Sequence, residues 1–186
     1  QSVPRDPPEL KSFAGQYLHA HRYRTPEPFS GQRVLVVGPG NSGVDIAADL
    51  CAVTGITVLC ARSPVLVMPR MMFGVPNSRT LLKLERPFLP WRVRIWIRTQ
   101  LTRIFHGRME QWGFRTPTSR THPISHPTLI SQIAWGRVRV RPGITSIEGR
   151  TVRFADGSTA RGSVAIACDG IHSAVRKQLY PDEGGV

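Results

Sequence analysis

The sequence contains one glycine-rich segment whose spacing suits the binding of a dinucleotide pyrophosphate. Gly38, Gly40 and Gly43 form a GxGxxG pattern that directly follows an apolar run and opens a helical stretch. In this pattern the first glycine permits a tight turn, the second lets the pyrophosphate approach the backbone, and the third permits close packing of helix on strand. Asn41 and Ser42 could add side-chain hydrogen bonds to the phosphates. The alternative is a glycine turn that serves backbone geometry alone.

The residues after the next expected strand indicate which dinucleotide binds. Enzymes that use NAD or FAD place an Asp or Glu there, which hydrogen-bonds to the ribose hydroxyls. Here Arg62 and Ser63 occupy that place, and a guanidinium and a hydroxyl suit the 2′-phosphate of NADPH, which a carboxylate would repel. The sequence therefore favours NADPH over NADH and FAD, with an ordinary surface role for Arg62 as the alternative.

The other reactive residues do not form a recognisable site. The six histidines lack HExxH or comparable metal spacing, and no Ser, His and acid can be placed together from sequence. Cys51, Cys60 and Cys168 are far apart and show no CxxC spacing, which predicts neither disulfides nor zinc and favours a reducing cytoplasm. We therefore expect no metal and assign no catalytic residue.

The glycine loop lies within a strand-helix-strand pattern. Residues 33–38 form a continuous apolar run typical of a strand buried on both faces of a parallel sheet. Residues 42–53 have helical spacing, and residues 56–61 restore the strand pattern. Residues 137–168 alternate short strands with turns, which predicts a β-hairpin region returning to the sheet. The predicted fold class is α/β, a Rossmann-like NAD(P)-binding domain with a parallel central sheet.

Two regions are expected to form a helical excursion from this sheet. Residues 64–90 are interrupted by prolines and by Gly74, which predicts little regular structure. Residues 91–106 keep helical spacing of apolar residues with arginines mostly elsewhere, which predicts an amphipathic, basic helix. We expect this helix to pack on the domain, and contact with a membrane surface is the alternative.

Length and composition predict the domain organisation. The 186 residues suit a proline-rich extended connector over 1–31, the NADPH-binding domain over 32–167 and a C-terminal tail over 168–186. No apolar run approaches the roughly 20 residues that span a bilayer. The net charge of +13 suits attraction of a polyanionic cofactor or an arginine-rich genome. Because the arginines are spread along the chain, no nucleic-acid partner is expected.

The segment from Phe13 to Arg24 resembles the FxGxxxHxxx(Y/F) fingerprint of the flavin-containing monooxygenases. The glycine loop, Arg62-Ser63, His126-Pro-Thr128 and residues 154–158 are also similar to that family. The resemblance implies an enzyme in which NADPH reduces FAD and the reduced flavin activates oxygen for transfer to a small-molecule substrate. Baeyer-Villiger relatives have Trp in place of Tyr23, so the resemblance leans toward heteroatom oxygenation.

The resemblance also implies a missing segment. That family places its FAD loop and active-site asparagine in an N-terminal region, whereas this sequence starts at Gln1 without them, so we expect a fragment that requires an upstream FAD-binding segment. At the other end, Asp169 belongs to a string that resembles the ADGxxSxVR motif of flavoprotein aromatic hydroxylases, in which the Asp bonds to FAD. An ordinary turn at Asp169 is the alternative. The competing function is a stand-alone NADP-binding or interaction domain without catalysis.

Overall fold

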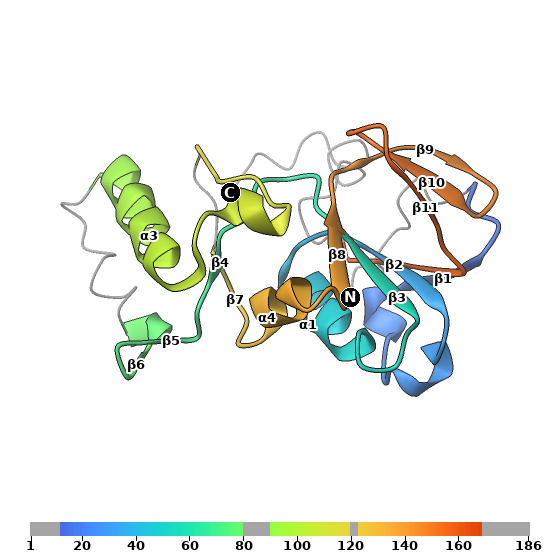
Figure 1. The fold of residues 1–186 in the computed structure, drawn as a ribbon, viewed down its shortest axis with the longest axis horizontal. Coiled ribbons are helices and arrows are strands. Elements are labelled where there is room, and N and C mark those ends of the chain that lie inside the picture. The colour runs from blue at the N-terminus through green and yellow to red at the C-terminus, as the bar shows by residue number, and fades with distance from the viewer. Residues whose placement is uncertain (1–11, 80–89, 120–122, 169–186) are drawn as a thin grey trace, which may run out of the picture.

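A five-stranded parallel sheet forms the centre of the molecule (Figure 1). The computed structural model describes residues 12–79, 90–119 and 123–168. The strand order is β1-β12-β2-β3-β8, and all neighbours are parallel. In that order the strands are Gln16–His19, Val164–Ala167, Arg33–Val37, Ile56–Cys60 and Val138–Arg141. The predicted α/β class with a Rossmann-like parallel sheet is confirmed.

Both faces of the sheet are covered, which explains why its three central strands, β12, β2 and β3, read as nearly continuous apolar runs. Helices α1 and α4 cover one face, and an antiparallel sheet of order β11-β10-β9 covers the other (Figure 1). Val34 and Val36 join the core on the helical side, whereas Leu35 packs with Val152 and Phe154 of the antiparallel sheet. These covering elements are α1 (Asn41–Leu50), α4 (Leu129–Ala134), β9 (Ile144–Glu148), β10 (Thr151–Phe154) and β11 (Thr159–Arg161).

The segment before the glycine loop contributes the edge strand β1, where the sequence predicted only an extended connector. Phe13 is buried, and a Cβ on Gly15 would lie 2.4 Å from the carbonyl oxygen of Ser163. The Tyr23 hydroxyl donates a hydrogen bond of 2.6 Å to Asp49 on α1. These residues of the fingerprint segment therefore fix it to the sheet edge and to the first helix.

Short strands lie in the excursion where little regular structure was expected. Strand β4 pairs in parallel with β7, and β5 pairs with β6 in a small antiparallel ribbon. Each is two residues long, and β4 depends on a partner far along the chain, so sequence periodicity could not reveal them. Their bounds are β4 Val67–Met68, β5 Met71–Met72, β6 Val75–Pro76 and β7 Ile124–Ser125.

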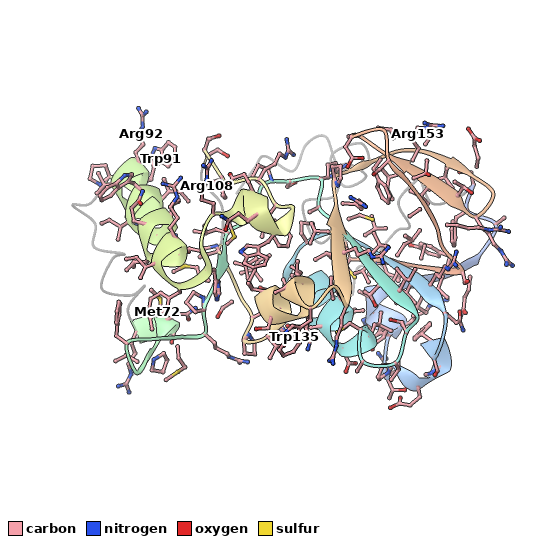
Figure 2. The ribbon with its side chains drawn as sticks, viewed as in Figure 1. Met72, Trp91, Arg92, Arg108, Trp135 and Arg153 are labelled. Atoms are coloured by element: carbon pink, nitrogen blue, oxygen red, sulfur yellow. The ribbon has the colours of Figure 1, made fainter. Side chains whose placement is uncertain are left out.

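Helix α3 (Trp91–His106) forms over the residues that the sequence predicted. A ring nitrogen of His106 lies 3.0 Å from the Val67 carbonyl oxygen, which ties the end of α3 to β4. Figure 2 shows Trp91 and Arg92 projecting from its other end, and Trp96 is 62% exposed. Among the described residues, no helix has the length and apolar character needed to cross a membrane.

Candidate functional site

The carboxyl ends of the parallel strands meet along one edge of the sheet. The pairing register aligns the last residue of each strand in a row: His19, Ala167, Val37, Cys60 and Arg141. The glycine loop follows the central strand β2, and Arg62 follows its neighbour β3. In open α/β sheets, ligands bind at this edge. The structure thus brings both predicted cofactor-binding segments to one place.

Two of the three glycines are required by the backbone of the loop itself. Gly38 adopts a φ of +112°, a backbone conformation that residues other than glycine rarely adopt. Its N–H donates to the carbonyl oxygen of Cys60 at 3.1 Å, so the turn is tied to β3. A Cβ on Gly43 would lie 1.9 Å from the Gly38 carbonyl oxygen. Helix α1 therefore packs on the turn at a distance that only glycine allows.

Gly40 differs because nothing in the described part of the fold requires a glycine there. Its φ is −69°, and a Cβ at this position would have the Cys168 carbonyl oxygen, 3.9 Å away, as its nearest heavy atom. Asn41 and Ser42, which begin α1, are exposed beside it. The N–H groups of a first helical turn have no partner within the helix and carry a partial positive charge. The loop therefore offers open space and backbone donors to an anionic group.

Arg62 lies exposed just past β3, next to other arginines. The Arg115 guanidinium donates a hydrogen bond to the Arg62 carbonyl oxygen. The neighbouring Ala61 N–H donates to the carbonyl oxygen of Arg141 at 2.7 Å, which holds this turn against β8. Ser63 is also exposed. Arg115 was not predicted, because it is 53 residues from Arg62 in the chain and no local pattern links the two.

The remaining sequence-based expectations concern the tail, the metals and the cysteines. Asp169 and the rest of the C-terminal tail lie outside the described residues, of which Cys168 is the last. Within 12–79, 90–119 and 123–168, no three His, Cys, Asp or Glu side chains are grouped in a way that could hold a metal ion.

Burial raises the pKa of the Cys60 thiol to about 12, so this thiol is not a nucleophile at neutral pH.

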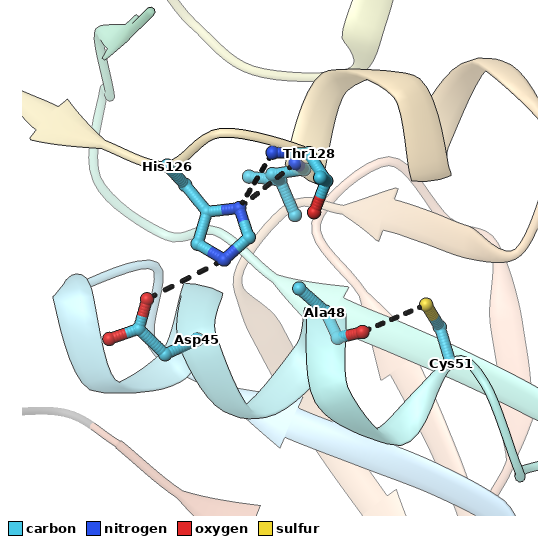
Figure 3. Close-up of polar contacts among 6 residues, drawn as sticks. Asp45, Ala48, Cys51, His126 and Thr128 are labelled. Carbon is cyan, nitrogen blue, oxygen red and sulfur yellow. Dashed lines mark hydrogen bonds and ion pairs between the residues drawn. The ribbon is translucent and has the colours of Figure 1, made fainter. Parts of the chain in front are cut away.

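His126 joins α1 to α4, as Figure 3 shows. Its Nδ1 accepts hydrogen bonds from the backbone N–H groups of Thr128 at 3.2 Å and Leu129 at 3.0 Å. Its Nε2 lies 3.6 Å from the carboxylate of Asp45 on α1. The imidazole therefore caps α4 in place of the Thr128 side chain, which makes no capping bond.

This arrangement requires a neutral imidazole, because a protonated Nδ1 could not accept from the backbone. Burial lowers the pKa of His126, although the Asp45 carboxylate opposes that shift. The unfolded chain, with an ordinary histidine pKa near 6.5, takes up the proton more readily than the folded chain. Stability from this group is therefore complete above about pH 6.5 and is lost as the pH falls toward the lower folded value.

We expect His126→Ala to lower the free energy of unfolding at pH 8 by about 1 kcal/mol, the usual cost of losing a helix cap. His126→Asn, which keeps an acceptor but does not titrate, should lose less at pH 8 and should flatten the fall in stability between pH 7 and 5. Urea unfolding followed by circular dichroism across this range measures both. An unchanged pH profile in His126→Asn would contradict the capping role.

Comparison with known proteins identifies similar sequences along almost the whole chain. A family model described as flavin-binding monooxygenase-like matches residues 2–170. Indole-3-pyruvate monooxygenase YUCCA8 of Oryza sativa subsp. indica is 34% identical over 179 residues, which are 91% of this chain and 42% of that protein. The putative dimethylaniline monooxygenase 6 (N-oxide-forming) of Homo sapiens is 31% identical over 161 residues, 81% of this chain and 29% of that protein. The chain thus spans less than half the length of these relatives.

Solved structures show the same fold at lower sequence identity. A flavin-containing monooxygenase from Stenotrophomonas maltophilia superimposes with a TM-score of 0.57 at 21% identity, over 93% of this chain and 40% of that one. The closed crystal structure of cyclohexanone monooxygenase gives a TM-score of 0.62 at 13% identity, over 90% of this chain and 44% of that one. At these identities the likeness concerns the fold alone.

Proposed function

Since the chain belongs to the flavin-binding monooxygenase-like family, we propose that it is the part of such an enzyme that binds and orients NADPH. The complete enzyme would be an FAD-dependent monooxygenase that oxygenates a small organic molecule. An FAD-binding segment upstream in the complete enzyme would hold the flavin. The chain spans 42% and 29% of the length of the two relatives, which accords with an enzyme whose FAD and NADPH are bound by different segments.

One observation carries the proposal: the open space at Gly40, between the turn at Gly38 and the first turn of α1. A pyrophosphate placed there would accept hydrogen bonds from backbone N–H groups and would face the positive end of the helix. The exposed side chains of Asn41 and Ser42 would add donors. Gly43 would serve the ligand indirectly, because it lets the helix approach the turn.

The arginines at the end of β3 support NADPH over NADH. A dinucleotide whose pyrophosphate lies on the loop extends its adenosine ribose toward the strand next to the loop, where Arg62 and Ser63 lie. Arg62 would form charge-assisted hydrogen bonds with the 2′-phosphate, and Ser63 would add a hydroxyl donor. The Arg115 guanidinium, held at the Arg62 carbonyl oxygen, would add a second positive charge. NADPH would then supply the hydride that reduces the flavin of the complete enzyme.

We expect Arg62→Ala to weaken NADPH binding about tenfold or more while NADH affinity stays nearly unchanged. A charge-assisted contact contributes about 1.5 to 3 kcal/mol, which corresponds to that loss. The alanine retains the backbone carbonyl that accepts from Arg115, so the turn should stay in place. Calorimetric titration with both cofactors measures the effect, with the exposed Arg153→Ala as the matched control. Equal losses for NADPH and NADH would show that Arg62 is structural.

A further inference from the structure

A second candidate site is a hollow on the sheet face that carries the antiparallel strands. It lies between the starts of β2 and β3, the strand β8 and the edge strand β11. Leu35, Ile56 and Val58 form its apolar part. On β2 the hollow is lined by Arg33, Val34 and Leu35, whereas the glycine loop begins at Gly38, three residues or about 10 Å beyond Leu35 along the chain. The hollow does not include the glycine loop, and of its lining residues Arg141 lies beside the turn that carries Arg62, because its carbonyl oxygen accepts from the Ala61 N–H.

Four arginines line this hollow. Arg33 comes from β2, Arg139 and Arg141 from β8, and Arg161 from β11. Arg139 and Arg141 are two residues apart on one strand, so both side chains project to the same face of the sheet. Thr159 adds a hydroxyl from β11. Guanidinium groups and hydroxyls together are the side-chain donors that suit phosphate oxygens.

Acidic residues do not balance this charge. No Asp or Glu lines the hollow, and within the described part of the chain none of the four arginines has a carboxylate oxygen within 4.0 Å. Asp156 interacts electrostatically with Arg141. The pKa of Asp156 is lowered chiefly by hydrogen bonds from Ser158, and the charge of Arg141 contributes to that shift. Four like charges around one hollow repel each other, and a bound anion would relieve that repulsion.

We propose that the hollow binds a small ligand that carries a phosphate or pyrophosphate group. Residues of both sheets line it, which suits a compact anion better than an extended polyanion. Its apolar part would contact a non-ionic portion of the ligand. Arg139 and Arg161 are the principal donors, because they come from the two different sheets and belong neither to the glycine loop nor to the turn at Arg62.

The test uses inorganic pyrophosphate as the probe, titrated into the chain by calorimetry at low ionic strength. Because pyrophosphate could also bind at the glycine loop, the titration is done in the Gly40→Val background as well as in the unmodified chain. We expect one pyrophosphate to bind in the Gly40→Val background. Arg139→Gln/Arg161→Gln in that background should weaken the binding at least tenfold.

The matched control is Arg150→Gln/Arg153→Gln, which removes the same charge from exposed positions near β10 that do not line the hollow. Figure 2 shows Arg153 projecting outward from the antiparallel sheet. The control variant Arg150→Gln/Arg153→Gln should change the pyrophosphate affinity less than twofold. Absence of binding in the Gly40→Val background, or equal weakening by both pairs, would overturn the proposal. Tighter binding of a single-stranded oligonucleotide through Arg139 and Arg161 would overturn it in favour of an extended polyanion.

These outcomes are independent of the proposed function. Arg139→Gln/Arg161→Gln alone should bind NADPH with unchanged affinity, because neither residue lies at the loop or at Arg62. If NADPH does not bind to the unmodified chain, the pyrophosphate titrations still test whether the hollow binds an anion. All the replaced arginines are exposed, and circular dichroism confirms that each variant is folded before titration.

Discussion

Gly40→Val is expected to weaken NADPH binding more than about a hundredfold, a loss of about 2.7 kcal/mol, while the fold stays nearly unchanged. The valine side chain would occupy the space where the pyrophosphate meets the backbone. The fold should tolerate it, because φ is −69° and, apart from its chain neighbours, no heavy atom of the described residues lies closer than 3.9 Å to a Cβ at this position. Val is a poorer N-cap than Gly, which costs about 1 kcal/mol at most.

Calorimetry with NADPH measures the binding, and urea unfolding of the same sample measures the fold. Loss of binding together with a stability loss above about 3 kcal/mol would mean that Gly40 has a structural role. Normal NADPH binding by a folded Gly40→Val chain would show that the pyrophosphate does not lie on this loop.

Gly43→Ala is expected to lower the free energy of unfolding by about 3 kcal/mol, the upper part of the usual range for overpacking. The added methyl group would lie 1.9 Å from the carbonyl oxygen of Gly38, a backbone atom that cannot move without opening the turn. Alanine is otherwise the better helix former by about 1 kcal/mol, so the contact must exceed that gain. Because typical domains have only about 5 to 15 kcal/mol of stability, the loss is large.

Gly40→Ala provides the matched control, since it makes the same chemical change three residues earlier, where the space is open. Urea midpoints should place Gly40→Ala near the unmodified chain and Gly43→Ala far below it. Equal midpoints for the two variants would contradict the packing of α1 on the turn.

Local patterns made much of the fold predictable from the sequence. The apolar run of β2, the glycine loop and the helical spacing of α1 lie within one continuous stretch, and α3 was predicted with its observed bounds. The edge strand β1 was missed because its place in the sheet depends on pairing with β12, about 150 residues later. The pairing of β4 with β7 was missed for the same reason.

In the candidate site, too, features that lie next to each other in the sequence could be predicted, and contacts between distant residues could not. The glycine pattern and Arg62 could be predicted, because each follows its own strand directly. Arg115 could not, since it reaches Arg62 through a fold that brings together residues far apart in sequence. His126 was noted only within a resembling string, and its capping role depends on a ring nitrogen placed over the following backbone. Sequence spacing does not reveal that geometry.

The NADPH-binding role is tested most simply by a calorimetric titration of the unmodified chain with NADPH, NADH and FAD under identical conditions. We expect one NADPH per chain, binding at least about tenfold tighter than NADH because of the 2′-phosphate contact with Arg62. We expect no stoichiometric binding of FAD, since the chain has one phosphate loop and an arginine where FAD sites have an acid. Tight, stoichiometric FAD or an absence of NADPH binding would contradict the assignment of this chain as the NADPH-binding part of the enzyme.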